Sequence, residues 1–296
     1  MRYGVPYRGS KNKIAQWVIL NLPAGDTLVD LFAGGCAVTH AALLSGKWKH
    51  IIANDIGDAP QLFMDAVHGK YAKEKRWISR EDFHRLKDSD PYVSLCWSFG
   101  NNRRDYLYSK EIEPWKKALH YARVFGDTSL LREFGINSDG SSKDIKPNNE
   151  EYKRLYSRWL GHQVKHKRFY DSEHLERLES LERLQILEGL QRLEGLQSDY
   201  RDVRIPSNAV VYADPPYKRT NCTGYKCDFD HKEFERWLSE VPSMVVVSEY
   251  EAPEGCVEVA SIKKQSSMGT GNKGGSGIEK LFVQKRFAEQ YKNSFA

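Results

Sequence analysis

Short apolar runs alternate with amphipathic segments along this chain, and the alternation predicts an α/β fold. Residues 26–32, 50–54 and 209–213 are apolar runs of the kind found in strands that are buried on both faces of a sheet. Residues 14–20 and 37–44 instead place apolar side chains at helical spacing. We therefore expect strands and helices to alternate around a mostly parallel sheet.

The last third of the chain continues this pattern and then changes it. Residues 229–238 have helical spacing, and 244–247 are another buried apolar run. Residues 257–262 and 278–283 have the pattern of an antiparallel pair. The expected sheet is mostly parallel, has helices on both faces and ends in an antiparallel closing strand.

A leucine recurs at every third position between Leu175 and Leu196. Around an α-helix, a period of three drifts by about 60° per step, so one apolar stripe cannot persist over the whole tract. Gly189 and Gly195 interrupt its second half. We predict a helix to about Leu187 and a strand over 193–197, with a low-complexity spacer as the alternative.

The tetrad Asp214-Pro215-Pro216-Tyr217 ends the apolar run at 209–213. Paired prolines cannot continue a strand, so the tetrad lies at a strand's carboxyl end, where open α/β sheets bind ligands. The carboxylate and the Pro215 carbonyl can accept both hydrogens of a nucleobase amino group, and Tyr217 can stack on a base that has left its duplex. The alternative, from these four residues alone, is a turn with a capping aspartate.

A second candidate site follows the first strand, at Ala33-Gly34-Gly35-Cys36. A strand, a glycine turn and a helix form the first half of a dinucleotide-type crossover. Both phosphate-cradling patterns, GxGxxG and GxxxxGK[ST], are absent, which argues against nicotinamide, flavin or nucleoside triphosphate. Asp55 ends the second strand, where it can accept hydrogen bonds from a ribose or cap the next helix.

Composition sets broad limits on function. With 296 residues, 40% hydrophobic and 29% charged, the chain can form one large α/β domain or two smaller ones. No apolar run approaches the roughly 20 residues that span a bilayer, and no secretory segment is visible, so we expect a cytoplasmic protein without a membrane partner. The net charge of +5 permits a polyanionic partner without requiring one. The five cysteines lack paired CxxC spacing, and we expect neither a disulfide framework nor a metal site.

Four motifs in this order carry a family resemblance: Tyr7-Arg8-Gly9-Ser10-Lys11, then 30–35, then Asn54-Asp55, and finally the tetrad at 214–217. The order resembles the Dam-type, or D12 class, DNA adenine-N6 methyltransferases. The resemblance covers about residues 1–70 and 199–290. It implies a Rossmann-like methyltransferase fold, S-adenosylmethionine as cofactor and double-stranded DNA as partner.

The resemblance also implies which residues bind the cofactor. Tyr7, Gly9 and Lys11 would lie along its methionine end, and Asp55 would hold its ribose. The turn beneath it would be shaped by residues at and after the strand end, namely Asp30, Phe32, Gly34 and Gly35. Asp199 would accept a hydrogen bond from the amino group of its adenine, and Tyr200 would cover the adenine ring. The alternative is that Asp199 caps a helix. One departure is visible, because the family usually has a second glycine where this chain has Cys36.

The middle of the chain, residues 71–173, is too long for a loop and corresponds to the family's inserted target-recognition domain. We therefore expect a largely helical recognition domain there and a catalytic domain over 1–70 and 174–296. Candidates for contact with DNA are Asn101, Asn102, Arg103, Arg104 and Lys218. The alternative for the first four is a polar loop beside core aromatics. The glycine-rich stretch 268–277 either orders against DNA phosphate or is a flexible hairpin tip.

The resulting hypothesis is transfer of a methyl group from S-adenosylmethionine to N6 of a flipped adenine in duplex DNA. Asp214 and Pro215 would orient the amino group, and Tyr217 would stack on the base. Cytosine-N4 transfer, an RNA or protein methyltransferase, and a DNA-binding module without catalysis are the alternatives. The oligomeric state is left open.

Overall fold

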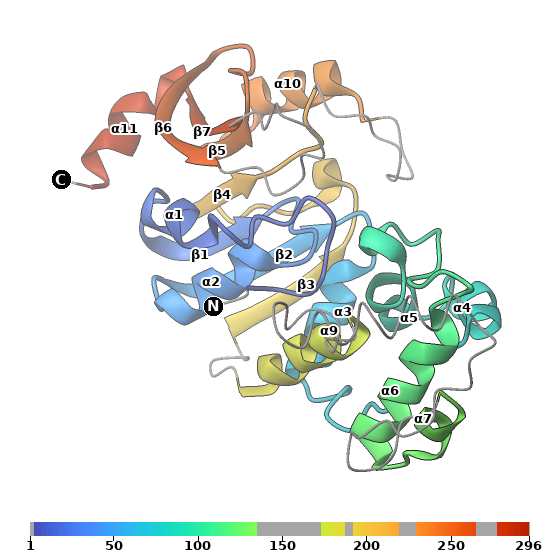
Figure 1. Ribbon diagram of the computed structural model, residues 1–296. Coiled ribbons are helices and arrows are strands. Elements are labelled where there is room, and N and C mark those ends of the chain that lie inside the picture. The colour runs from blue at the N-terminus through green and yellow to red at the C-terminus, as the bar shows by residue number, and fades with distance from the viewer. Residues whose placement is uncertain (1–2, 135–172, 187–191, 219–228, 265–276, 296) are drawn as a thin grey trace. The chain divides into compact units, whose positions relative to one another are not determined.

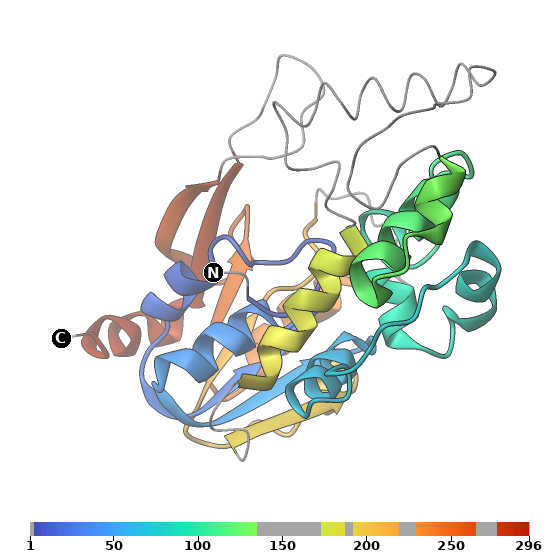
Figure 2. The ribbon, with the colours of Figure 1, turned by 60° about the horizontal axis from the view of Figure 1, so that its bottom comes forward.

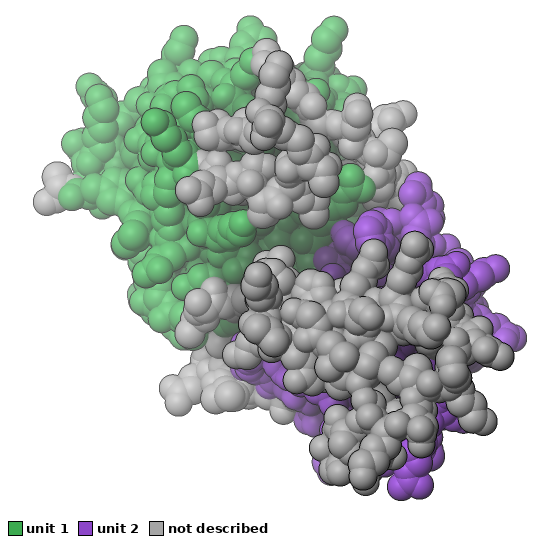
Figure 3. Space-filling model, in the orientation of Figure 1, with its two compact units in different colours: residues 1–68, 184–296 green, residues 69–183 purple. Residues whose placement is uncertain are grey.

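The computed structural model of the chain describes residues 3–134, 173–186, 192–218, 229–264 and 277–295. Its contacts divide it into unit 1, residues 1–68 and 184–296, and unit 2, residues 69–183 (Figure 3). Most of the glycine-rich stretch 268–277 lies outside the described residues.

Unit 1 is built on a seven-stranded sheet with the order β3-β2-β1-β4-β5-β7-β6. β1 pairs in parallel with β2 and β4, as do β2 with β3 and β4 with β5, whereas β7 runs antiparallel to both β5 and β6 (Figure 1). The hairpin of β6 and β7 forms one end of the sheet (Figure 2). The strands are β1 (Gly25–Asp30), β2 (Trp48–Asp55), β3 (Leu193–Gln197), β4 (Ala209–Ala213), β5 (Val245–Glu249), β6 (Cys256–Lys264) and β7 (Gly277–Gln284). The predicted sheet is confirmed.

Helices cover both faces of this sheet. Side chains alternate along β1, so Asp30 points to the face of α2, where Thr39 bonds its carboxylate, while Val29 points to the opposite face. On that opposite face Phe234 and Leu238 of α10 join the core formed by β1, β4 and β5. The helices of unit 1 are α1 (Ala15–Leu20), α2 (Ala37–Ser45), α3 (Ala59–Val67), α10 (His231–Glu240) and α11 (Ala288–Asn293), with short 3-10 turns at Tyr200–Asp202 and Lys285–Phe287. No helix in the described part of the chain is long and apolar enough to cross a membrane.

Several element boundaries differ from the prediction by one or two residues, and local hydrogen bonds explain the start of α10. The carboxylate of Asp230 accepts from the backbone N–H groups of Lys232 and Glu233, so α10 begins at His231 and leaves Phe229 outside the helix. β1 ends at Asp30 and not at Phe32.

The leucine tract changes its helical geometry partway along. α9 (Glu173–Glu182) is α-helical and is followed directly by a 3-10 turn, Arg183–Ile186. A 3-10 helix has three residues per turn, so leucines spaced by three stay on one face there. Leu181 and Leu184 are both buried. The tract then enters β3, as predicted, and the predicted end of the helix at Leu187 lies outside the described residues.

Unit 2 is helical in its described part. The helices are α4 (Arg80–Leu86), α5 (Pro91–Cys96), α6 (Glu113–Phe125), α7 (Ser129–Glu133) and α9, with a 3-10 turn at Phe99–Asn101. Side chains cap two of them: Ser79 accepts from the N–H of Asp82 at the start of α4, and Asp90 accepts from the N–H of Tyr92 at the start of α5.

A chain of hydrogen bonds between buried rings links the helices of unit 2. His120 Nε2 lies 2.9 Å from the carbonyl oxygen of Lys75, His120 Nδ1 lies 2.8 Å from His174 Nε2, and His174 Nδ1 lies 2.7 Å from the Tyr108 hydroxyl. A carbonyl only accepts, so His120 Nε2 donates to it; in neutral rings His174 Nε2 then donates to His120, and Tyr108 donates to His174. Burial lowers the pKa of both histidines, which keeps the rings neutral.

This chain predicts acid sensitivity of unit 2. Unfolded histidines titrate near pH 6.5, whereas the folded rings resist protonation. Unfolding therefore takes up protons as the pH falls below about 6.5, and unit 2 should lose up to about 1.4 kcal/mol of unfolding free energy per pH unit for each histidine. Amide hydrogen exchange of α5 and α6 between pH 7 and 5 measures the loss. His174→Gln should reduce the slope, while His84→Gln, at an exposed position on α4, should not.

Candidate active site

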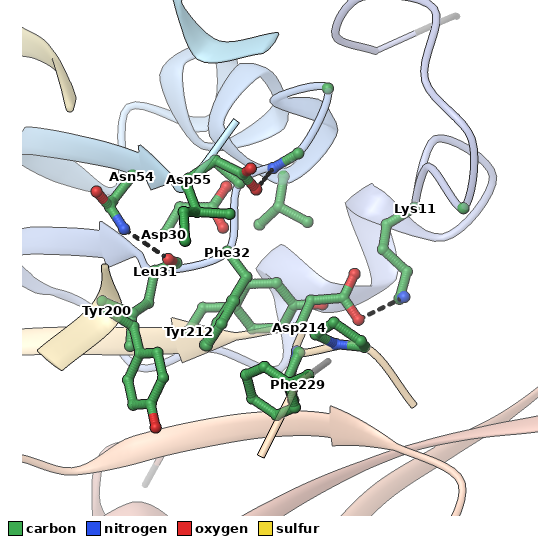
Figure 4. Close-up of a pocket in the computed structure, with 18 of the residues that line it drawn as sticks. Lys11, Asp30, Leu31, Phe32, Asn54, Asp55, Tyr200, Tyr212, Asp214 and Phe229 are labelled. Carbon is green, nitrogen blue, oxygen red and sulfur yellow. Dashed lines mark hydrogen bonds and ion pairs between the residues drawn. The ribbon is translucent and has the colours of Figure 1, made fainter. Parts of the chain in front are cut away.

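A cavity of about 460 Å³ opens in unit 1 at the carboxyl ends of β1, β2 and β4, within the size range of small-molecule sites. Every residue that the sequence nominated for catalysis or for cofactor binding lines it (Figure 4). These residues are Tyr7, Gly9, Lys11, Asp30, Phe32, Gly34, Gly35, Asp55, Asp199, Tyr200, Asp214, Pro215, Pro216 and Tyr217. The convergence follows from the topology, because parallel strands present their carboxyl ends at one edge of the sheet.

The glycine turn after β1 packs tightly against Tyr7. A side chain on Gly34 would place its Cβ 2.8 Å from Cε1 of the Tyr7 ring, and one on Gly35 would lie 2.5 Å from the Cβ of Tyr7. Gly34 also has a positive φ of 47°. Only glycine meets both requirements without strain, so this part of the turn depends on its two glycines.

Cys36 stands where the family pattern has its second glycine, and it adopts the left-handed conformation with φ 57° and ψ 34°. Such a conformation costs a residue with a Cβ roughly 1–2 kcal/mol. The departure seen in the sequence is therefore accommodated by backbone strain at the start of α2.

Asp55 holds the same turn from the neighbouring strand. Its Oδ2 accepts from the N–H of Gly34 at 2.9 Å, and its Oδ1 accepts from the N–H of Gly57 at 2.8 Å. It does not cap the next helix, because the residue before α3 is Asp58. A carboxylate has about four acceptor positions, so Asp55 can still accept bonds from a ligand's hydroxyl groups.

Asp30 is a buried carboxyl group in the wall of the cavity. Its Oδ2 accepts from the N–H and the hydroxyl of Thr39, at 3.1 and 2.6 Å. Burial raises the pKa of Asp30 to about 7, although the bonds from Thr39 act in the opposite direction. The charge on this wall therefore changes within the physiological pH range.

Aromatic rings form another wall. The ring of Phe32 lies 5.3 Å from that of Tyr200 and 5.7 Å from that of Phe229, measured between centroids. Next to them, Asp199 accepts from the N–H of Arg201 and so caps a 3-10 turn while also lining the cavity. The cap read from the sequence is therefore confirmed, and a bond from Asp199 to the cofactor's adenine stays a prediction.

Asp214, which also lines the cavity, forms an ion pair with Lys11, with 2.6 Å between Oδ1 and Nζ (Figure 4). Burial lowers the pKa of Lys11, but the charges of Asp214 and Glu279 outweigh it and the pKa stands above its ordinary value. Burial raises the pKa of Asp214, and the ammonium of Lys11 opposes that rise. Lys11 therefore remains protonated beside the carboxylate.

Tyr217 is held on several sides. The Lys11 ammonium lies 4.7 Å from its ring centroid, and the ring of Tyr250 meets it edge-on at 4.7 Å. Its hydroxyl donates to Glu279, with Ser248 Oγ 3.1 Å away. Burial raises the pKa of this hydroxyl, as do the charges of Asp214 and Glu279, so it stays protonated. Its stacking on a base stays a prediction.

The residues nominated for DNA contact do not line this cavity. In unit 2, the amide of Asn101 donates to the carbonyl of Leu95, and that of Asn102 donates to Asp105, which also pairs with Arg104. Arg104 is exposed and Arg103 is half-buried. In unit 1, the Lys218 ammonium pairs with Glu235 at 2.6 Å.

Sequence reasoning missed several residues that contribute to the site. Asn54 is buried and bonds the backbone of Leu31 and Ser198 at the ends of β1 and β3. Tyr212, Phe229 and Tyr250 line the cavity. The position of Asn54 beside Asp55 was a usable signal, whereas nothing in the local sequence links Tyr250 with residue 217.

Comparison with known proteins identifies a family. A family model described as D12 class N6 adenine-specific DNA methyltransferase matches residues 7–263. Among solved structures, the chain is similar to the rRNA methyltransferase AviRa from Streptomyces viridochromogenes. The two share 16% identity over 94% of this chain and 84% of that chain, with a TM-score of 0.34, which is too low to bear on substrate or site. No curated protein matches the chain.

The glycine turn yields a stability prediction with an internal control. Gly46 ends α2 with a φ of 64°, and a Cβ there would meet no atom within 4 Å, so Gly46→Ala should cost only about 1–2 kcal/mol for the left-handed backbone. Gly34→Ala adds the contact with Tyr7 and should cost more. Urea unfolding of the two variants gives the comparison, and equal losses would show that Tyr7 moves aside freely.

Proposed function

The chain belongs to the D12 class of N6 adenine-specific DNA methyltransferases, and we propose that its cavity binds S-adenosylmethionine beside an adenine flipped out of duplex DNA. It is an enzyme that methylates adenine N6 in DNA. The observation that carries the proposal is that both nominated residue sets, for cofactor and for catalysis, line one cavity in unit 1.

The residues present fit S-adenosylmethionine by their chemistry. The rings of Phe32, Tyr200 and Phe229 offer apolar surface for the adenine of the cofactor, and Asp199 lies beside them. Asp55 offers acceptor positions for the ribose hydroxyls. Asp30, when ionised, attracts the ammonium of the methionine part. When bound, the cofactor supplies an electrophilic methyl group on a positively charged sulfur.

The chain's own contribution is to bind and orient the amino group of the target. Asp214 and the carbonyl of Pro215 would accept the two hydrogens of the target's amino group. The lone pair of this nitrogen is otherwise delocalised into the base, and these two bonds would direct it away from the ring plane. Oδ1 of Asp214 is already held by Lys11, so the carboxylate is fixed before the target arrives. The proton released after transfer can pass to Asp214, whose pKa burial has raised.

The target base must leave its duplex, because N6 is inaccessible within the base stack. We propose that unit 2 contributes the target-recognition function, corresponding to the expected recognition domain of residues 71–173. On the loop after the 3-10 turn, the exposed Arg104 and the half-buried Arg103 carry the positive charge that contact with phosphate needs.

Asp214→Asn tests the catalytic assignment. The amide keeps the shape of the carboxylate but loses its charge, so methylation should fall on the order of 10²-fold or more, while cofactor affinity stays within about threefold. The measurement is methyl transfer to duplex DNA followed by digestion to nucleosides, which also separates N6-methyladenine from N4-methylcytosine. Asp26→Asn, at an exposed ion pair on β1, is the matched control and should keep full activity. A fully active Asp214→Asn enzyme would refute the role.

The pKa of Asp30 predicts how cofactor binding depends on pH. As the pH rises from 6 to 7.5 the carboxyl, with its pKa of about 7, becomes ionised and attracts the methionine ammonium. The dissociation constant for S-adenosylmethionine should therefore fall over this range. Binding of 5′-methylthioadenosine, which lacks both positive charges, should change little, and calorimetric titrations of the two ligands make the comparison.

A further inference from the structure

We propose that Glu279, on the antiparallel strand β7, is a positioning residue for Tyr217 of the catalytic tetrad. The inference deepens the proposed function and rests on it. Glu279 lies 62 residues beyond Tyr217 in the chain and comes from the closing hairpin, which no motif of the sequence connects with catalysis.

Several donors of the site converge on one carboxylate oxygen. Oε1 of Glu279 accepts from the hydroxyl of Tyr217 and from the hydroxyl of Ser248 on β5, the latter at 3.0 Å. The ammonium of Lys11 lies 3.5 Å from the same oxygen. The register places Ser248 opposite Leu281 on the paired strand β7, two residues along from Glu279, so the pairing of β5 with β7 brings these groups together.

Glu279 is buried, and specific hydrogen bonds and a nearby ammonium compensate its charge. The side chain is fully buried, at 0% exposure. An isolated buried carboxylate is strongly destabilising unless charges and hydrogen bonds compensate it. Here the compensating groups are Tyr217, Lys11 and Ser248. Two of these line the cavity, so the cost of burying Glu279 is offset by groups of the active site itself.

The arrangement has a consequence for the reaction. A tyrosine ring on a turn after two prolines can swing to another position about its Cα–Cβ bond, but a ring whose hydroxyl is anchored at its far end cannot. The phenol stays protonated, so the anchor persists across the working pH range. Glu279 therefore fixes the direction of the long axis of the Tyr217 ring at the place where the target base is expected, and it acts on the target through Tyr217 without touching the reacting atoms.

A double-mutant cycle distinguishes this role from a general contribution to folding. Glu279→Gln keeps an acceptor oxygen but removes the charge, and it should lower the single-turnover rate of methylation by about tenfold or more, with the cofactor dissociation constant within about threefold of wild type. Tyr217→Phe should also lower the rate. If Glu279 acts through the Tyr217 hydroxyl, the loss in the double variant should be clearly smaller than the product of the two single losses.

Controls separate the possible outcomes. Glu258→Gln makes the same chemical change on the neighbouring strand β6, where Glu258 pairs with Lys280 at 2.8 Å, and it should leave the rate within twofold. If Glu279→Gln does not fold, Glu279→Asp replaces it in the double-mutant cycle. Aspartate keeps the negative charge, but its side chain is one methylene shorter, so the carboxylate lies farther from the Tyr217 hydroxyl. Losses that multiply, or a Glu279 variant as fast as wild type, would overturn the positioning role and leave the proposed function standing. A wild-type enzyme that methylates no adenine would overturn both.

Discussion

The parallel pairing of β1 with β2 on one side and β4 on the other is the constraint on which the site depends. Asp30 at the end of β1 stands opposite Ala53 and Tyr212, so β2, which ends at Asp55, and β4, which ends at Ala213, end within two residues of the same level. The glycine turn, Asp55 and Asp214 are therefore neighbours, although they come from three distant parts of the sequence. A slip of one residue in either pairing would turn alternate side chains to the opposite face.

The cavity wall also carries more acidic than basic groups. The cavity wall contains the carboxyl groups of Asp30, Asp55 and Asp214, and a single buried ammonium, that of Lys11, lies among the groups at its catalytic end. Such a surplus of negative charge suits a cationic ligand, and burial strengthens it because screening by water is weak there. Burial, and to a smaller extent the charges of Asp214 and Asp55, raise the pKa of Asp30 to about 7.

Local patterns predicted a large part of this structure. The strands at 193–197 and 209–213 and the glycine turn follow from short-range signals, namely apolar runs, proline stops and turn residues. Most of the nominated cavity residues instead follow from the family resemblance. Contacts between distant segments were not predictable. The bond from Tyr217 to Glu279 joins the turn after β4 to β7. The sequence predicted that β7 pairs with β6, but it contains no signal that places Glu279 beside Tyr217. The start of α10 likewise depended on a cap at Asp230, which excluded Phe229 from the helix and left it in the cavity.

The passage of the leucine tract from α9 into a 3-10 turn lies where unit 2 gives way to unit 1. In a 3-10 helix three residues make one complete turn and advance the chain by about 6 Å. This turn contains a single leucine, Leu184. A gene that gained or lost one three-residue repeat here would change the length of the segment by one full turn, so the side chains that follow would keep their face.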